Sequence, residues 1–239
     1  MKFVKALLSS SWRTFAFLAA ASLGVTPSFA QTSVSSNTSP VTLESVTKAV
    51  SGARTVFTHF SQERHLSLFD EPLRSEGYLC FEQPGSVRWE VTAPYQSILV
   101  SDGSGLAQFE KIDGAWKKID LGLAAAMQNV VSQIAGVMKG DYARDQRTYS
   151  VSLITTNSEP TIQLSPRNEK MRKMIQAIEV HLSPELNATR SVVLREAAGD
   201  YTLIRFDQQQ VNITFPGQVF DRKTPLPLDQ LQSVLAKTK

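Results

Sequence analysis

The chain has 239 residues, of which 42% are hydrophobic and 20% are charged, a composition typical of a folded protein with a sizeable core. Its formal net charge of +3 comes from Lys2, Lys5 and Arg13, because removing those three leaves 22 Lys and Arg against 22 Asp and Glu. Because the remainder is neutral, the basic pI of the chain is no argument for binding to nucleic acid or anionic membranes. The lone cysteine, Cys80, excludes an intramolecular disulfide framework, and its apolar neighbours predict a small buried side chain.

The first 30 residues have the pattern of a secretory signal peptide. Basic residues precede an apolar run, FAFLAAASLGV, which is too short to span a bilayer, and Ser28-Phe29-Ala30 follows as a small-x-small cleavage pattern. We predict cleavage after Ala30, with a retained N-terminal anchor as the alternative. Residue 31 is Gln and not the Cys that a lipoprotein needs, so we expect a mature protein that is not itself lipidated.

The mature chain begins with a polar, Ser/Thr-rich stretch, and residues 31–40 are expected to be a disordered leader. An amphipathic helix should follow, with Thr42 as its N-cap. Its apolar face comprises Leu43, Val46, Val50, Ala53 and Phe57. From Phe57 the period changes to two, which predicts a long strand that reaches Leu68.

Many short strands are predicted after this point. Turn residues punctuate the apolar runs of the block 76–109, which predicts strands at 78–81, at 87–91, at 98–100 and from Leu106. The connections are short, so the strands should pair antiparallel. Further strands are expected at Phe109–Ile112, Trp116–Ile119, Tyr149–Ile154, Thr161–Leu164, Ile175–Leu182, Arg190–Glu196 and Tyr201–Asp207.

One internal helix is predicted over 121–138, ended by Gly140. It carries a broad apolar stripe of Leu123, Met127, Val130, Val131, Ile134, Val137 and Met138. A helix this apolar either completes a core or covers a cavity, and periodicity does not separate the two.

The central block resembles the LolA-type periplasmic carriers of outer-membrane lipoproteins. The resemblance is carried by Pro84, Trp89, Pro94 and the run Ile98-Leu99-Val100-Ser101-Asp102-Gly103. Supporting matches are Phe57-Thr58-His59-Phe60-Ser61-Gln62, similar to the family's opening strand, and Val211-Asn212-Ile213-Thr214-Phe215-Pro216, similar to its closing strand. The match extends over most of the mature chain.

This resemblance implies a mainly-β α+β fold in one domain, residues 41–239. The sheet is expected to be antiparallel and strongly curved, forming a half-open barrel with helices over its concave apolar face. The implied function is a periplasmic carrier in a Gram-negative bacterium. Its cargo would be an acylated lipoprotein, received from an inner-membrane transporter and passed to an outer-membrane receptor.

Strand parity then names the expected site. The cavity wall is predicted to comprise Leu79, Phe81, Val87, Trp89, Val91, Ile98, Val100 and Leu106, and the stripe of the 121–138 helix would be its lid. In the family an Arg before the first Pro is linked to holding the lid closed. Here that position is Gln83, which hydrogen-bonds but lacks the charge and fork of guanidinium.

The sequence indicates no enzyme. It contains no nucleophile elbow, Walker loop or His-Glu-x-x-His, and His59, His65 and His181 have no metal-ligand spacing. We therefore expect no catalytic residue, no metal, no cofactor and no nucleic-acid partner, and a monomer. The alternatives to a lipoprotein carrier are a carrier of a different amphiphile, such as a lipid or glycolipid, and a lipid-sensing periplasmic regulator.

Overall fold

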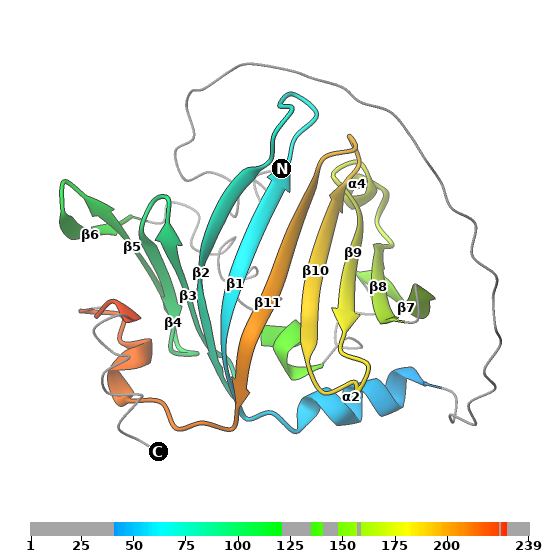
Figure 1. The fold of residues 1–239 in the computed structure, drawn as a ribbon, viewed down its shortest axis with the longest axis horizontal. Helices are drawn as coiled ribbons and strands as arrows, with labels where there is room; N and C mark the ends of the chain where they lie inside the picture. Colours follow the sequence, from blue (N-terminus) through cyan, green and yellow to red (C-terminus); the bar gives the residue numbers. More distant parts are fainter. Residues whose placement is uncertain (1–40, 121–134, 141–147, 157–158, 225, 229–239) are drawn as a thin grey trace, which may run out of the picture.

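A computed structural model describes residues 41–120, 135–140, 148–156, 159–224 and 226–228. Its strands form one antiparallel 11-stranded sheet in the order β6-β5-β4-β3-β2-β1-β11-β10-β9-β8-β7 (Figure 1). The strands are β1 (Thr55–His65), β2 (Leu73–Glu82), β3 (Ser86–Ala93), β4 (Ser97–Ser101), β5 (Leu106–Ile112), β6 (Ala115–Ile119), β7 (Tyr149–Thr156), β8 (Glu159–Pro166), β9 (Ile175–Leu182), β10 (Thr189–Glu196) and β11 (Tyr201–Val211). The helices are α2 (Leu43–Ser51), α4 (Glu169–Arg172), the short 3₁₀ helix η1 (Gly217–Phe220) and the helical residues 135–139.

The mainly-β antiparallel architecture confirms the prediction, but the expected curvature does not hold. The sheet is open and not strongly curled, because β6 and β7 each pair on one side only among the described residues. Closing a barrel would require these two edge strands to pair with each other. The signal peptide expected at 1–30 and the leader at 31–40 lie outside the described residues.

The sequence predicted a strand at the place of each observed one, but it misplaced some ends and added one strand. The first helix ends at Ser51, so Phe57 belongs to β1 and not to the helix. The expected closing strand at 211–216 is wrong, since β11 ends at Val211. There Asn212 adopts a positive φ of 56°, and its side-chain oxygen accepts a hydrogen bond from the Arg54 N–H at 2.8 Å. That local geometry ends the ladder.

The start of α2 is fixed by the residues at its N-terminus, as predicted. The hydroxyl of Thr42 accepts a hydrogen bond from the backbone N–H of Ser45 at 3.1 Å, and the Ser45 hydroxyl accepts one from the Thr42 N–H at 3.0 Å. This reciprocal capping box satisfies N–H groups that a helix leaves without intrahelical partners. It also fixes the direction in which Val46 and Val50 enter the core.

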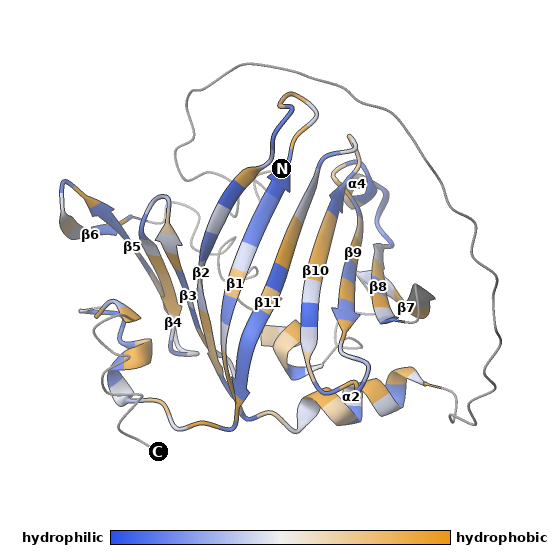
Figure 2. Ribbon diagram, in the orientation of Figure 1, coloured by the Kyte–Doolittle hydropathy of each residue, from blue (hydrophilic) through white to orange (hydrophobic). Residues whose placement is uncertain are grey.

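Side chains alternate between two faces of the sheet. Both β10 and β11 carry hydrophobic as well as hydrophilic positions (Figure 2). We call the face that bears Phe60, Leu79 and Trp89 the inner face; α2 and residues 135–139 pack on it. The opposite, outer face bears Cys80, whose thiol is fully buried. Burial raises the pKa of Cys80 to about 12, so this thiol is an inert packing group, as its sequence context predicts.

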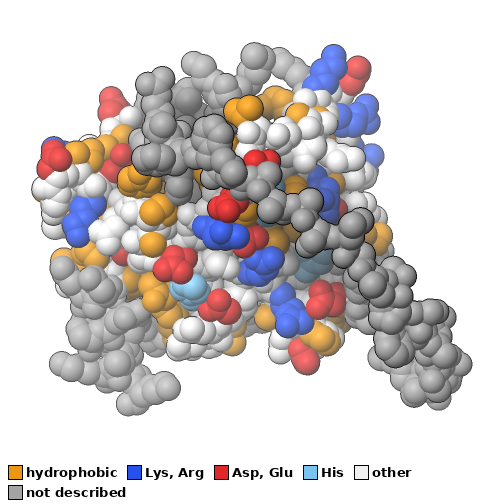
Figure 3. Space-filling view, turned by 45° about the horizontal axis from the view of Figure 1, so that its top comes forward, with side chains coloured by type: hydrophobic (Ala, Val, Ile, Leu, Met, Phe, Trp, Pro, Cys, Tyr) orange, Lys and Arg blue, Asp and Glu red, His pale blue; other side chains and the backbone are white. Residues whose placement is uncertain are grey.

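The middle of the outer face is polar. Glu63 accepts ion pairs from Arg74 at 3.5 Å and Arg205 at 3.4 Å, and His59 lies 3.1 Å from Asp207. Charged side chains of both signs and a histidine gather on the face drawn in Figure 3. Such half-exposed pairs contribute little stability each, and this part of the sheet is a solvated surface.

Candidate apolar binding face

The inner face carries two hydrophobic clusters. The first lies on β1, β2 and β3, where the rings of Phe60 and Trp89 stack with centroids 4.0 Å apart. Its buried members are Ala53, Val56, Phe60, Leu79, Phe81, Val87, Trp89, Ala135 and Met138. The second joins α2 to β8 and β9 through Val46, Val50, Ile162, Val180 and Leu182. Val137 packs against both clusters, so the apolar surface continues across the sheet.

Two helical segments cover this surface and abut one another. Residues 135–139 end at Gly140, whose N–H donates to the Val137 carbonyl at 3.1 Å and whose φ is +68°. A Cβ added to Gly140 would lie 2.8 Å from the Cβ of Val50, closer than such atoms pack. Only glycine therefore fits where this helical segment ends against α2, and the helix end predicted there is confirmed.

The predicted lid residues are partly placed. Val137 and Met138 lie against the sheet, and Met138 is buried in the first cluster. The other members of the predicted stripe, Leu123, Met127, Val130, Val131 and Ile134, lie outside the described residues.

Six of the eight predicted wall residues lie together on the inner face. Leu79, Phe81, Val87 and Trp89 are buried in the first cluster, and Val91 and Leu106 pack against it.

Ile98 and Val100 do not join the other wall residues. They pack on the outer face with Ala107 and Phe109, and this corrects the predicted wall. Leu99 faces inward instead, because it pairs directly opposite Trp89. The run Ile98-Leu99-Val100 is apolar at both parities, so its sequence holds no signal for which residues face inward.

Gln83 contacts the end of α2. Its backbone N–H donates to the Arg54 carbonyl at 2.9 Å, and its side-chain Nε2 donates to the carbonyls of Ala53 at 3.0 Å and Ser51 at 3.4 Å. The last carbonyls of a helix have no intrahelical partner, so a side-chain donor there fixes the helix end. The residue at the family's Arg position therefore bonds the backbone that leaves α2.

The outer face carries a buried ion pair that the sequence did not indicate. Arg88 is fully buried, and its Nη2 lies 2.6 Å from Oε2 of Glu90. Arg88 also donates to the carbonyls of Val219 at 3.1 Å and Leu226 at 2.6 Å, while the Leu228 N–H donates to Glu90 at 3.1 Å. These bonds dock the C-terminal segment, which we define as residues 216–228.

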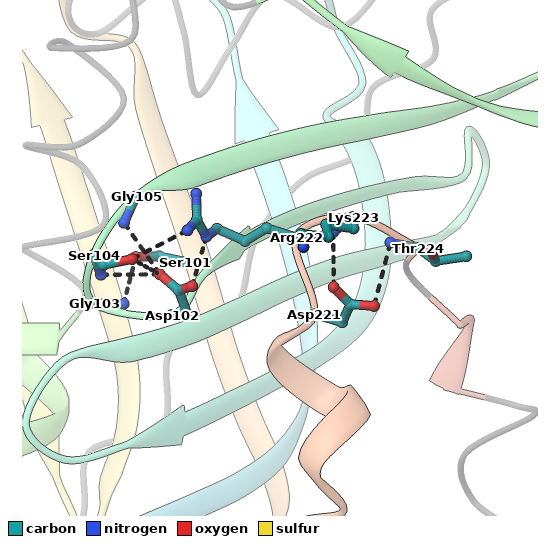
Figure 4. Close-up of polar contacts among 9 residues, drawn as sticks. All are labelled: Ser101, Asp102, Gly103, Ser104, Gly105, Asp221, Arg222, Lys223 and Thr224. Carbon is teal, nitrogen blue, oxygen red and sulfur yellow. Dashed lines mark hydrogen bonds and ion pairs between the residues drawn. The ribbon is translucent and has the colours of Figure 1, made fainter.

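A second charged contact ties the C-terminal segment to the β4–β5 turn (Figure 4). Asp102 accepts hydrogen bonds from the N–H groups of Ser104 at 2.9 Å and Gly105 at 3.1 Å, and from Arg222 Nε at 2.7 Å. Burial alone would raise the pKa of Asp102, but the hydrogen bonds from Arg222 and Ser104 hold it well below its usual range. The Ser-Asp-Gly motif therefore closes a turn and holds a distant segment.

Among the described residues, no group of three or more His, Cys, Asp and Glu side chains is arranged to hold a metal ion. Within the same part of the chain, no helix has the length and hydrophobicity needed to cross a membrane.

The family described as "Outer membrane lipoprotein carrier protein LolA" matches residues 51–223, which include all the strands of the sheet and the Asp102–Arg222 contact. The chain belongs to the LolA family. An outer-membrane lipoprotein carrier protein of Chromohalobacter salexigens is 22% identical to this LolA-family chain over 160 residues, or 66% of this chain and 71% of the relative. The protein of the same description from Bordetella avium is 24% identical over 161 residues, with the same coverage.

Solved structures similar to this LolA-family protein include a DUF1329 family protein from Desulfovibrio piger. Its TM-score is 0.44 at 8% identity, over 77% of this chain and 96% of that one. A LolA superfamily protein from Nitrosomonas europaea has a TM-score of 0.41 at 8% identity, over 76% of this chain and 98% of that one. LolA-family proteins are carriers and not enzymes, which confirms the sequence-based expectation.

Proposed function

We propose that this protein binds the acyl chains of lipoproteins between the inner face and the helical segments that cover it, and carries them through the periplasm from the inner to the outer membrane. The observation that carries the proposal is the continuous apolar surface across the sheet, covered by α2 and residues 135–139. Membership of a family of lipoprotein carriers supports the same reading.

The free energy of transferring an acyl chain out of water favours its binding to an apolar sheet face. An acyl chain of about 15 carbons gains roughly 12 kcal/mol on leaving water, at about 0.8 kcal/mol per methylene, so it needs shielding during transit. The carrier must also release it. Phe60, Trp89 and Met138 present surfaces without directional contacts, which adapt to flexible chains and exchange them readily.

The cover is the part of the site that must move. In the proposed mechanism α2 and the predicted lid helix lie over the apolar inner face, and an entering chain replaces their apolar contacts with its own. Few polar contacts oppose this exchange. Among them are the hydrogen bonds from the Gln83 side chain to the Ala53 and Ser51 carbonyls, which connect the β2–β3 turn to the end of α2. A loading transporter in the inner membrane and a receptor at the outer membrane complete the proposed route, after removal of the signal peptide 1–30.

A second candidate keeps the fold and changes the cargo. Gln83 stands where the family typically has Arg, so the contact to α2 lacks a charge. This departure favours a carrier of a different amphiphile, a lipid or glycolipid, as the alternative function.

Binding to the inner face is tested by Val91→Asp, which places a carboxylate on a half-buried position of the predicted wall. We expect the affinity of the mature protein for a fluorescent fatty-acyl probe to fall at least about tenfold, because the charge must be desolvated when the chain binds. The matched control is Ile154→Asp on β7, at a position 36% exposed whose strand neighbour Leu153 packs on the inner face, so Ile154 faces the other way and affinity should be unchanged. Equal affinity in both variants and wild type would contradict the proposed site.

Native mass spectrometry of the protein purified from periplasm identifies the cargo. A co-purified acylated lipoprotein supports the leading function, and a free lipid or glycolipid supports the second. A protein that carries nothing and binds no acyl probe rejects both.

A further inference from the structure

The inner face changes from apolar to polar along β1. From the α2 end of the strand, Val56 and Phe60 are fully buried in the first cluster, whereas the next inward-facing side chains are Gln62 and Arg64. The partners on β11 change in the same direction, because Phe206 lies opposite Phe60 and Thr202 opposite Arg64. One surface thus has an apolar part and a polar end.

The polar end contains a charged pair and a hydroxyl that are shielded from water. Arg64 Nη2 lies 3.7 Å from Oε1 of Glu196, and both side chains are less than 20% exposed. Burial is the largest influence on Glu196 and raises the pKa of its carboxyl. Within the described part of the chain, Oε1 of Glu196 and the hydroxyl of Thr202 are buried without a hydrogen-bond partner, and Thr202 is only 4% exposed. Buried polar groups are normally hydrogen-bonded, so this geometry is suited to receive polar atoms of a ligand.

We propose that the polar end of the inner face, formed by Thr202, Glu196 and Arg64, binds the neutral ester and amide groups at the root of an acylated ligand, with the chains directed toward α2. The inference rests on the proposed function and adds an orientation to it. Thr202 donates its hydroxyl proton to an ester or amide carbonyl, and the Glu196 carboxylate accepts an amide N–H. Arg64 balances the charge of Glu196, so the site as a whole attracts polar groups without a net charge.

The charge of Glu196 also argues against an anionic root. A phosphate placed beside Thr202 would stand next to a shielded carboxylate, and like charges in such surroundings repel strongly. Ester and amide groups meet no such repulsion. The site therefore favours the root of a diacylglyceryl or N-acyl group over a phospholipid headgroup.

The length of the apolar part fits this orientation. Gln62 lies six positions after Val56, which at a rise of about 3.3 Å per residue is roughly 20 Å of strand. Half of the roughly 30 Å hydrocarbon core of a bilayer is about 15 Å, the depth that one layer of acyl chains fills. A chain whose root contacts Thr202 can therefore lie along the apolar part and reach the α2 end of the sheet.

The test compares three fluorescent probes of equal chain length: 1-pyrenyldodecane, the N-methylamide of 1-pyrenyldodecanoic acid, and 1-pyrenyldodecyl phosphate. Thr202→Val removes only the hydroxyl. We expect it to weaken binding of the amide about fivefold, the value of one hydrogen bond, and to leave binding of the alkane within about twofold. Thr202→Ser should restore the affinity for the amide. The matched control is Thr189→Val, which removes another buried hydroxyl without a described partner, at the opposite end of β10, and should change neither affinity.

The outcomes separate the inference from the function on which it rests. If the wild-type protein binds neither the alkane nor the amide, the apolar carrier function fails. If it binds both and Thr202→Val leaves their affinity ratio unchanged, the polar site is wrong and the carrier function stands. Tighter binding of the phosphate than of the amide would overturn the neutral chemistry assigned to the ligand root.

Discussion

Gln83 reaches from the β2–β3 turn to the end of α2. Its single side-chain nitrogen donates both to the carbonyl of Ser51, the last residue of α2, and to the carbonyl of Ala53 just beyond the helix. The bond to Ser51, at 3.4 Å, is the longer of the two. A guanidinium at this position would offer several donors in a planar fork and a charge beside the negative end of the helix dipole. If Gln83 acts as the proposed latch, it would hold α2 less firmly than an Arg would.

Gln83→Arg is expected to hold α2 more firmly and to lower the fluorescence of a hydrophobic probe that enters the inner face. Charge-assisted hydrogen bonds are stronger than those of an amide, so both carbonyls would be bonded at once. Gln83→Ala should act in the opposite direction, at a cost of about 1 kcal/mol in unfolding free energy. A Gln83→Arg variant whose inner face is more accessible to the probe would contradict the latch.

For single residues, the sequence predicted which face of the sheet a side chain lies on wherever one side of the strand is apolar and the other is polar. Leu79, Val87 and Trp89 obey that rule. It failed for Ile98, where both faces of β4 are covered, and it gave no sign that the C-terminal segment covers Arg88. Burial that depends on a segment more than 100 positions away has no local signature.

Among the elements, the junction between α2 and the helical residues 135–139 decides how the inner face is covered. The two meet at Gly140, where a positive φ and the contact with Val50 both require glycine. Strand positions were predictable because turn residues separate the apolar runs. The packing of this helix end against α2 depends on a tertiary contact, which the periodicity of the sequence does not reveal.

Gly140→Ala should destabilise the protein more than Gly199→Ala. Both positions have positive φ, +68° and +92°, so each substitution brings a backbone strain of about 1–3 kcal/mol. Only at Gly140 would the new methyl also press on Val50, since nothing lies within 4 Å of a Cβ at Gly199. Thermal unfolding of both variants measures the difference, and a hydrophobic probe should enter the inner face more easily in Gly140→Ala alone. Equal melting temperatures and equal probe signals would show that this junction is not tightly packed.

At the scale of the whole molecule, the two faces of the sheet are covered by different means. The described cover of the inner face makes mainly apolar contacts, while charged groups dock the C-terminal segment on the outer face through Arg88, Glu90 and the pair Asp102–Arg222. An apolar ligand can compete with apolar contacts but not with buried charge-assisted hydrogen bonds. The segments that cover the inner face are therefore suited to displacement by an apolar ligand, whereas the C-terminal segment is suited to stay bound to the outer face.

The contact between Asp102 and Arg222 should make the outer cover sensitive to acid. Because the pKa of Asp102 is lowered in the folded state, its contribution is complete above the unfolded pKa near about 4 and is lost as pH falls through the folded pKa. We expect Asp102→Asn to lower stability at pH 7 by about 1 kcal/mol, discounted because the pair is about one-third exposed. The difference in melting temperature between the variant and wild type should shrink as the pH is lowered below about 4.

Binding of an acyl probe should be the same in Asp102→Asn and wild type at pH 7, since the change lies on the outer face. A large loss of probe affinity would show that the two faces are coupled. A difference in melting temperature that persists unchanged in acid would exclude ionised Asp102 as its source.

The strand order also governs how the chain can fold. All pairings from β1 to β6 and from β7 to β11 join neighbours in sequence, whereas the seam between β1 and β11 brings together residues such as His59 and Asp207, 148 positions apart. Hairpins form in microseconds, but contacts between distant residues pay a loop-closure entropy and form late. Two meanders should thus arise independently and join at a seam that is completed last. Until β11 is available, the edge of β1 that pairs with β11 has unpaired backbone groups. A chaperone that binds this edge would prevent aggregation during the slowest step of folding.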